Sequence, residues 1–280
     1  MDVLFPRTLE ELQKLRTETP GDLIMAGGTD LLVKIRKTGQ KPTVIFCIER
    51  IAELQRLDVL DDEIVIGAAV TLQQLLECDT IKTELTALFE ALSVLASPPV
   101  RHSATLVGNV CTASSAGDTL PPLYVFAAEV EIANTSGRRR QSIAEFITGP
   151  GKTTLQPDEI VTAVRVPRPV DGTHSVYYKV GKRKAMAIAV ASMAARFELG
   201  EAGAIKNIKM AWGSVGPTVV RAIDVEAYLA GRSLSIDCLR EAGRLASAAV
   251  CPIDDVRASA DYRRQVTGNL LLRLARDKRD

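Results

Sequence analysis

The stretch "AGGTDLL", residues 26–32, contains the residue types that hold a phosphate group without a basic side chain. Gly27 and Gly28 carry no Cβ and can adopt a positive φ, and Thr29 adds a hydroxyl donor. An apolar stretch precedes this turn and a helical pattern follows it, so its N–H groups and the helix start would form an anion-binding concavity. A plain tight turn explains the same residues, so this motif alone leaves both interpretations open.

A second stretch, "ATLVGNVCTASSAGD" at residues 104–118, strengthens the phosphate interpretation. Gly108 with Asn109 allows another close backbone approach, and Asp118 could accept from a ribose hydroxyl. The hydroxyl side chains of this stretch are Thr105, Thr112, Ser114 and Ser115. Two such turns, about 80 residues apart, could bind one diphosphate from both sides through N–H and O–H donors.

Two better-known phosphate motifs are absent. The dinucleotide pattern G-x-G-x-x-G does not occur in the sequence. The stretch "FITGPGKTT" resembles a nucleoside-triphosphate loop, but Phe146 stands where that loop needs its first glycine. We therefore expect a strand, a turn and a strand over residues 146–154.

Composition narrows the class of protein. Of the 280 residues 46% are apolar, which is enough for a core, and no run of about 18 apolar residues predicts a membrane span. The N-terminus lacks a signal-peptide pattern, so a cytoplasmic location is expected. The net charge of +1 predicts neither a nucleic-acid nor an anionic-membrane partner, and Arg138–Arg140 is expected on a solvated hairpin strand.

Metal-binding and nucleophilic residues are few. None of the cysteines forms a pair separated by two residues, so no zinc or iron–sulfur pattern appears, and their odd number argues against disulfides. The chain has only two histidines, His102 and His174, which are expected to be structural. The cysteines, all expected as free thiols, are Cys47, Cys78, Cys111, Cys238 and Cys251.

The hydrophobic pattern predicts a first region with a βαβ-type unit and a second region of strands followed by helices. The first region has helices at 8–16 and 31–37, strands at 22–26, 42–48, 63–67 and 158–167, and a hairpin at 127–146. The strand at 63–67 leads into a helix within residues 68–77, whose register continues through 85–97 and ends at Pro98. Residues 100–122 read as a long functional loop. After a linker at 169–173, strands are expected at 175–180, 187–199 and 205–215, and helices at 224–231, 237–250 and 260–278. The last helix places Val266, Leu270, Leu271 and Leu274 on one face, which predicts core packing.

Five motifs now occur in an order that resembles a known family: "AGGTDLL", "IGAAVTLQQL", "SATLVGNVCTASSAGDTLPPL", "GKTTLQPDEIVTAVRVP" and "YYKVGKRKAMAIAVASMA". The chain is similar over nearly its whole length to the FAD-binding medium subunit of the molybdenum hydroxylases. That group includes xanthine dehydrogenase, aerobic carbon monoxide dehydrogenase and related hydroxylases of aromatic or N-heterocyclic compounds.

The resemblance implies an α+β fold with two domains. Residues 1–170 would form a two-part FAD-binding domain of the vanillyl-alcohol-oxidase type, with subdomains at about 1–55 and 56–170. Residues 171–280 would form a smaller α+β domain of the carbon monoxide dehydrogenase flavoprotein C-terminal type.

The resemblance also implies FAD as the cofactor and gives its binding positions. The first turn would contact the diphosphate through Ala26, Gly27, Gly28, Thr29, Asp30 and Leu31. The second loop would surround the diphosphate and ribose through Thr105, Gly108, Asn109, Thr112, Ser114 and Asp118. Val161 would lie near the adenine or the flavin, and Lys179 near the flavin ring, where its charge would stabilise the anionic reduced ring. No catalytic residue and no metal ligand are implied.

Two positions depart from the family pattern. Relatives usually have a second glycine where this chain has Val107, which adds a branched side chain where the backbone is expected to be bare. Relatives also often have proline at the position of Ser115, so this turn is expected to be looser. Val107 therefore predicts a cofactor that is shifted slightly or bound more weakly.

By this resemblance the chain would be an electron-transfer subunit. Electrons would arrive from [2Fe–2S] clusters on a small partner subunit, after hydroxylation at a molybdenum-cofactor large subunit, and leave to NAD⁺, a quinone or O₂. The assembly would be a hetero-oligomer, in the family a dimer of heterotrimers. The alternatives are a stand-alone flavin oxidase or reductase of the same fold, which needs an acid–base group that no shared motif supplies, and a binding module that has lost FAD.

Overall fold

The computed structural model describes residues 1–19, 22–200 and 203–276, and the chain forms two compact units. The segments of unit 1 are Met1–Cys78, Ala96–Ala113 and Ala127–Arg168. The segments of unit 2 are Asp79–Leu95, Ser114–Phe126 and Pro169–Asp280. Each unit is therefore built from discontinuous pieces of the sequence, and the domain boundary at residue 170 stays a prediction.

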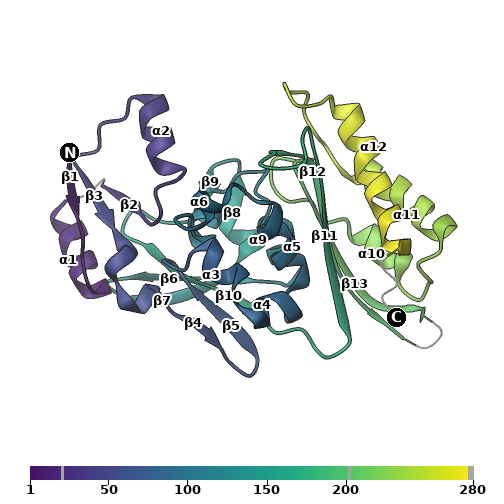
Figure 1. Ribbon diagram of the computed structural model, residues 1–280, viewed down its shortest axis with the longest axis horizontal. Helices are drawn as coiled ribbons and strands as arrows, with labels where there is room; N and C mark the ends of the chain where they lie inside the picture. Colours follow the sequence, from purple (N-terminus) through teal and green to yellow (C-terminus); the bar gives the residue numbers. More distant parts are fainter. Residues whose placement is uncertain (20–21, 201–202, 277–280) are drawn as a thin grey trace. The chain divides into compact units, whose positions relative to one another are not determined.

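A small parallel sheet opens unit 1 (Figure 1). Its strand order is β1-β3-β2, with β1 at Asp2–Leu4, β2 at Leu23–Met25 and β3 at Val44–Cys47. Two helices belong to this part, α1 at Leu9–Glu18 and α2 at Leu31–Thr38. Because β2 and β3 pair in parallel and α2 connects them, the predicted βαβ unit is confirmed. Gly39 ends α2 in the left-handed conformation, at a φ of 67°.

The second sheet of unit 1 is antiparallel, with the order β4-β5-β10-β6-β7. Its strands are β4 (Leu57–Val59), β5 (Glu63–Gly67), β6 (Glu129–Asn134), β7 (Gly137–Ser142) and β10 (Ile160–Pro167). A short pair, β8 (Ile147–Gly149) and β9 (Lys152–Thr153), confirms the strand–turn–strand prediction. The arginines of β7 are ion-paired, for example Arg139 with Glu159 at 2.7 Å.

The helices of unit 1 correct the prediction for residues 100–122. They are α3 (Leu72–Leu76), α6 (Pro98–Arg101), α7 (Leu106–Thr112) and α9 (Ile143–Phe146), with 3₁₀ turns at Ile48–Arg50 and Ala52–Leu54. The prediction of a long loop over 100–122 was wrong, because Thr105 caps α7 within that stretch. Pro98 and Pro99 begin a helix, since a helix tolerates proline in its first turn, where the missing N–H is not needed.

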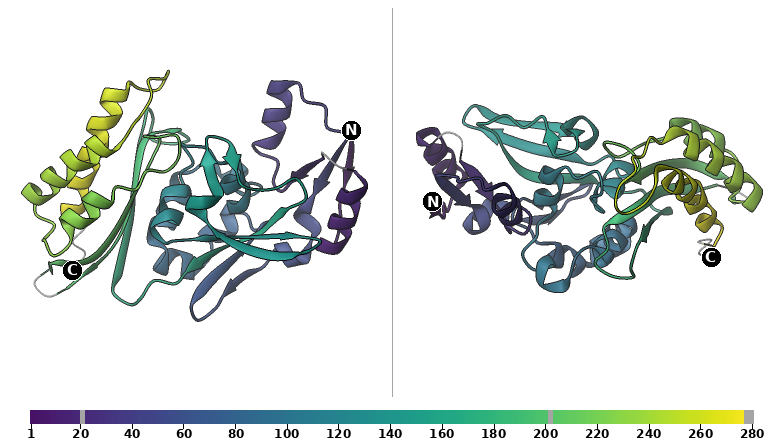
Figure 2. Two further views of the ribbon diagram at one scale, coloured as in Figure 1. Left: turned by 180° about the vertical axis from the view of Figure 1, so that it is seen from behind. Right: turned by 90° about the horizontal axis from the view of Figure 1, so that it is seen from above.

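Unit 2 is built on an antiparallel sheet of order β11-β12-β13, whose members are β11 (Thr173–Gly181), β12 (Ala189–Leu199) and β13 (Ile205–Gly213). Its helices are α4 (Asp79–Glu84), α5 (Thr86–Val94), α8 (Leu120–Val125), α10 (Ile223–Leu229), α11 (Ile236–Ala249) and α12 (Ala260–Leu271), followed by a 3₁₀ turn at Leu272–Arg276. The later helices cover one face of the sheet (Figure 2). Helices α5 and α8 also contact its strands.

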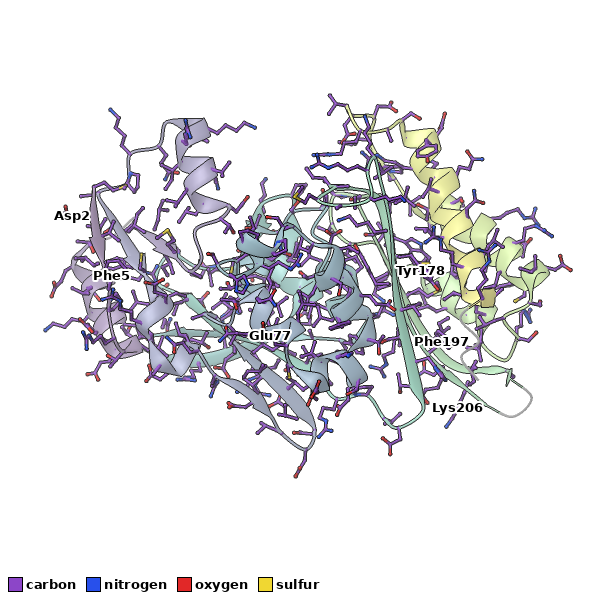
Figure 3. The ribbon with its side chains drawn as sticks, viewed as in Figure 1. Asp2, Phe5, Glu77, Tyr178, Phe197 and Lys206 are labelled. Carbon is purple, nitrogen blue, oxygen red and sulfur yellow. The ribbon has the colours of Figure 1, made fainter. Side chains whose placement is uncertain are left out.

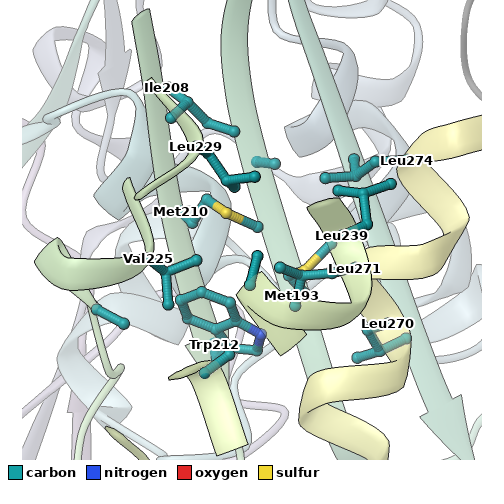
Figure 4. Close-up of a cluster of buried hydrophobic side chains, with 14 of the residues drawn as sticks. Met193, Ile208, Met210, Trp212, Val225, Leu229, Leu239, Leu270, Leu271 and Leu274 are labelled. Atoms are coloured by element: carbon teal, nitrogen blue, oxygen red, sulfur yellow. The ribbon is translucent and has the colours of Figure 1, made fainter. Parts of the chain in front are cut away.

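The core of unit 2 lies between this sheet and the later helices (Figure 4). Trp212 and Met193 on the strands pack with Leu271 and Leu274, all fully buried. The predicted apolar face of the last helix is therefore confirmed as core. Residues 277 and 278 of that predicted helix lie outside the described residues.

Two general predictions can be compared with the described part of the chain. All of the cysteines are free thiols. Among the described residues there is no helix long and apolar enough to cross a membrane, and no group of three or more His, Cys, Asp or Glu arranged to hold a metal ion.

Candidate functional site

The first glycine turn joins β2 to α2 in unit 1. Gly28 adopts a φ of 69°, which favours glycine. Gly27 packs against the backbone before α7, where a Cβ would stand 1.7 Å from the carbonyl oxygen of Ser103. The turn therefore needs glycine at both positions. Gly28 is needed for its backbone conformation, and Gly27 because the backbone of Ser103 lies so close.

Several backbone N–H groups of this turn are available to bind a ligand. Within the described part of the chain, the N–H groups of Gly27, Gly28 and Thr29 donate no hydrogen bond. Asp30 does not cap α2 with its side chain; its Oδ2 accepts instead from the hydroxyl of Thr112, at 3.1 Å. This bond brings the end of the second loop beside the first turn. Free N–H groups ahead of a helix can bind an anion.

The second predicted loop contains a capped helix. The hydroxyl oxygen of Thr105 accepts from the N–H of Gly108 at 3.0 Å, and the carbonyl oxygen of Thr105 accepts from Asn109 at 3.1 Å. A Cβ at Gly108 would stand 2.9 Å from that hydroxyl oxygen. Glycine at this position therefore preserves the cap.

A cavity of about 370 Å³ lies in unit 1 and connects the predicted positions. Its wall includes Ala26 of the first turn, Gly108 of α7 and Val161 of β10. Val107 also lines it and is only 4% exposed, so its side chain forms part of the apolar wall. The size and the apolar lining are those of a small-molecule site. Weaker binding because of Val107 stays a prediction.

Most ionisable groups around this cavity are already bound or neutral. Arg16 donates to the carbonyl oxygen of Glu159 at 3.1 Å, and burial lowers the pKa of Arg16. The Glu159 carboxylate accepts two bonds from Arg139, at 2.7 and 2.8 Å. Burial raises the pKa of Cys111 to about 12, so this thiol stays protonated and is a poor nucleophile.

In unit 2, Asp118 and Lys179 form a buried pair. Lys179 Nζ donates to Asp118 Oδ2 at 2.6 Å, and the two side chains are 9% and 4% exposed. The Tyr177 hydroxyl donates to Asp118 Oδ1 at 2.7 Å. Burial raises the pKa of Asp118, and Lys179 opposes that change. Burial and the Asp118 carboxylate together raise the pKa of Tyr177.

The predicted site residues thus fall into two groups. Unit 1 contains those of the first turn, the α7 positions and Val161; unit 2 contains Ser114, Asp118 and Lys179. The Ser114 hydroxyl oxygen accepts from the N–H of Ala116 at 3.3 Å, within its own turn.

Sequence reasoning missed two residues. Tyr177 lies two positions before Lys179 on β11, and since alternate strand residues share a face, this spacing could have indicated it. Figure 3 labels Tyr178, the residue between them on the strand. Asp22, which lines the cavity of unit 1, has no distinguishing signal in the sequence.

Two family profiles match this chain. The family described as "FAD binding domain in molybdopterin dehydrogenase" matches residues 1–169, and that described as "CO dehydrogenase flavoprotein C-terminal domain" matches residues 176–277. Together they extend over nearly all of the sequence, and they agree with the α+β fold predicted from the motifs.

Individual relatives agree with the profiles. The "Xanthine dehydrogenase FAD-binding subunit" of Escherichia coli O157:H7 is 31% identical, over 91% of this chain and 88% of the relative. The "Nicotinate dehydrogenase FAD-subunit" of Eubacterium barkeri is 30% identical, over 93% of this chain and 90% of the relative. The solved structure of carbon monoxide dehydrogenase from Hydrogenophaga pseudoflava superposes with a TM-score of 0.91 at 27% identity, covering 98% of this chain and 95% of that one.

The geometry of unit 1 fits the cofactor named by these matches. Its free backbone donors suit a diphosphate, and its apolar cavity suits a ring system. The fold is the predicted two-domain α+β fold, an FAD-binding domain followed by the carbon monoxide dehydrogenase flavoprotein C-terminal domain. The chain therefore belongs to the FAD-binding flavoprotein subunits of the molybdenum hydroxylases, a family of oxidoreductases.

Proposed function

We propose that this chain is the electron-transfer subunit of a multi-subunit molybdenum hydroxylase. It receives electrons from [2Fe–2S] clusters on a small partner subunit and passes them to an external acceptor. Substrate hydroxylation takes place at the molybdenum cofactor of a large partner subunit. The assembly is a hetero-oligomer, with a dimer of heterotrimers as the expected form.

One observation carries this proposal: unit 1 offers free backbone donors beside an apolar cavity, and Arg16, Cys111 and Glu159 of the described lining are not available for catalysis. Cys111 stays protonated, and Arg16 and Glu159 are held by other protein groups. Such a site positions a cofactor and leaves the chemistry to it. A stand-alone oxidase or reductase needs a free acid–base group near its substrate.

The residues of this chain bind and orient the cofactor. The N–H groups of Gly27, Gly28 and Thr29 would hold the diphosphate, with the Thr105-capped start of α7 beside them. Val107 and Val161 would exclude water from the ring that enters the cavity. FAD held by these residues would supply both one-electron and two-electron redox chemistry, which suits a link between one-electron clusters and a final acceptor.

We also propose that Lys179 supplies the positive charge for the flavin ring. Its ammonium group is held by Asp118 and lies 3.4 Å from the carbonyl oxygen of Val94. A fixed ammonium favours a ring that gains negative charge on reduction. An unchanged flavin potential in the Lys179→Met holoprotein would contradict this role.

The experiment is to isolate the complex through a tag on this chain and to measure its FAD, iron and molybdenum. FAD is then removed, and the FAD-free complex is mixed with a reductant that enters at the molybdenum centre. We expect the clusters to become reduced while transfer to NAD⁺, a quinone or O₂ stops, and added FAD to restore it. Isolation of the chain alone, with turnover of a small substrate, would support the oxidase or reductase alternative instead.

A further inference from the structure

Asp22 leaves a hydrogen-bond acceptor without a partner beside the cavity of unit 1. The residue lines this cavity and immediately precedes β2. Its Oδ1 accepts from the N–H of Val44 at 3.0 Å, which fixes the carboxylate against β3. Its Oδ2 is buried and has no hydrogen-bond partner within the described part of the chain. A buried acceptor without a hydrogen bond destabilises the folded protein, so we expect a ligand to donate a hydrogen bond to this oxygen.

The other ionisable groups of the cavity do not compete for that ligand. Arg16 is bound to backbone carbonyl oxygens, and the Glu159 carboxylate is bound by Arg139 and by the N–H of Gln156. Cys111 is a weak donor and stays protonated. Asp22 Oδ2 is therefore the acceptor with free capacity among these described groups.

The position of Asp22, immediately before β2, determines which part of the ligand can reach it. Asp22 lies four positions before Ala26, a distance of about 13 Å at about 3.3 Å per strand residue. A diphosphate held at the first turn would extend its ribose into this interval and its base toward Asp22. A reduced flavin ring is disfavoured there, because it gains negative charge and the carboxylate would repel it. An aminopurine instead presents an N–H donor.

We propose that Asp22 is the residue that selects an amino-bearing purine in this site. Its Oδ2 accepts a hydrogen bond from the exocyclic amino group of the adenine of FAD, and the cavity holds the adenine ring. This assignment rests on the proposed function, since it concerns the adenine end of the same cofactor. Asp22 is a specificity-determining residue and takes no part in electron transfer.

The test is titration calorimetry on the FAD-free chain with ADP and with inosine diphosphate, in which a carbonyl oxygen replaces the amino group. Because the amino group would donate to a charged carboxylate, ADP should bind at least about tenfold more tightly than inosine diphosphate. N6,N6-dimethyl-ADP, which cannot donate from that nitrogen, should lose a similar factor. This comparison needs no variant.

Asp22→Asn gives the sharpest contrast. The amide keeps an oxygen for the N–H of Val44 and replaces Oδ2 with an N–H donor. The variant should therefore prefer inosine diphosphate, reversing the order seen in the wild type. Asp61→Asn, at an exposed position of the same unit, should keep the preference for ADP.

The outcomes separate the two proposals. Equal binding of ADP and inosine diphosphate by the wild type, or an unchanged preference in Asp22→Asn, would overturn the role of Asp22 while FAD binding stands. A folded chain that binds neither FAD nor ADP would overturn both proposals. A preference for ADP that reverses in Asp22→Asn supports them together.

Discussion

The first turn of unit 1 and the Asp118–Lys179 pair of unit 2 are both polar and both lie at predicted cofactor positions, yet their hydrogen bonding differs. The N–H groups of Gly27, Gly28 and Thr29 have no acceptor in the described part of the chain. Both carboxylate oxygens of Asp118, in contrast, accept a bond from a protein side chain.

The difference separates ligand binding from folding. The first turn gains its hydrogen bonds only when an anion binds, so changes there should weaken cofactor binding most. The Asp118–Lys179 pair is satisfied by the protein itself, so changes there should destabilise unit 2 whether or not FAD is present. Single substitutions in the two regions test this contrast.

Gly27→Ala should have the largest effect, on FAD binding. Its Cβ would meet the carbonyl oxygen of Ser103 at 1.7 Å, so the turn or the neighbouring backbone must move. Overpacking of this kind costs about 1–3 kcal/mol, and we expect FAD affinity to fall up to about 100-fold in a fluorescence titration. Gly149→Ala is the control, because its Cβ would have only ordinary contacts, at 3.8 Å or more. Equal affinities of the two variants would contradict the account.

Lys179→Met should lower the free energy of unfolding by about 3 kcal/mol, since it leaves the buried Asp118 carboxylate without its cation. The loss should be the same without FAD and with oxidised FAD in urea unfolding, because the oxidised ring carries no negative charge for Lys179 to stabilise. Lys179→Met combined with Asp118→Asn should recover part of it, because the unpaired charge is gone. Lys206→Met, at an exposed position of β13, is the matched control. A single variant as stable as the wild type would show that the pair contributes nothing.

Asp255 is a second satisfied group in unit 2, and it predicts a pH dependence. Burial would raise its pKa, but N–H bonds from Arg257 and Ala258 and the Arg263 guanidinium lower it to about 2, from 3.8. A lowered pKa in the folded state stabilises the protein above about pH 4, and this contribution is lost as the pH falls toward 2. Partial exposure reduces the expected effect to about 1–2 kcal/mol.

The measurement for Asp255 is urea unfolding at several pH values between 4.5 and 2. Asp255→Asn should flatten the dependence over this range, whereas Asp237→Asn, whose side chain is 92% exposed, should leave it unchanged. A wild-type curve with the same slope as Asp255→Asn would refute the assignment.

Thr105→Ala should have the smallest effect on stability, about 1 kcal/mol, through loss of the α7 cap. It should also weaken FAD binding, because α7 lies beside the first turn. Thr8→Ala removes the equivalent cap of α1, where the hydroxyl oxygen accepts from Glu11 at 3.1 Å. Thermal unfolding should show similar losses for the two variants, and only Thr105→Ala should change FAD affinity. If Thr105→Ala and Thr8→Ala bind FAD with the same affinity, the α7 cap does not contribute to FAD binding.

The sequence revealed the first turn because few residue types suit it. Gly28 has a positive φ and Gly27 a close backbone neighbour, and both requirements point to glycine. The helices and strands around it follow from apolar periodicity and from Thr8 and Gly39 at helix ends.

The rest depended on tertiary contacts. Helix α7 was missed because its seven residues are too few for a hydrophobic period, although its Thr105 cap was visible. The hydrogen bond between Tyr177 and Asp118 could not be predicted from the sequence, because the two residues are 59 positions apart. Asp22 could not be identified from the sequence, because its significance lies in the buried Oδ2, which has no hydrogen-bond partner among the described residues.

Whether the turn and cavity of unit 1 hold FAD can be measured directly from the visible absorption spectrum of the purified chain with and without added FAD. Any chromophore is then released by denaturation and identified. An FAD site in unit 1 should give a two-banded oxidised-flavin spectrum, FAD in the released fraction, and a higher unfolding temperature when FAD is bound. A folded chain that stays colourless in excess FAD, with an unfolding temperature unchanged by FAD, would contradict it.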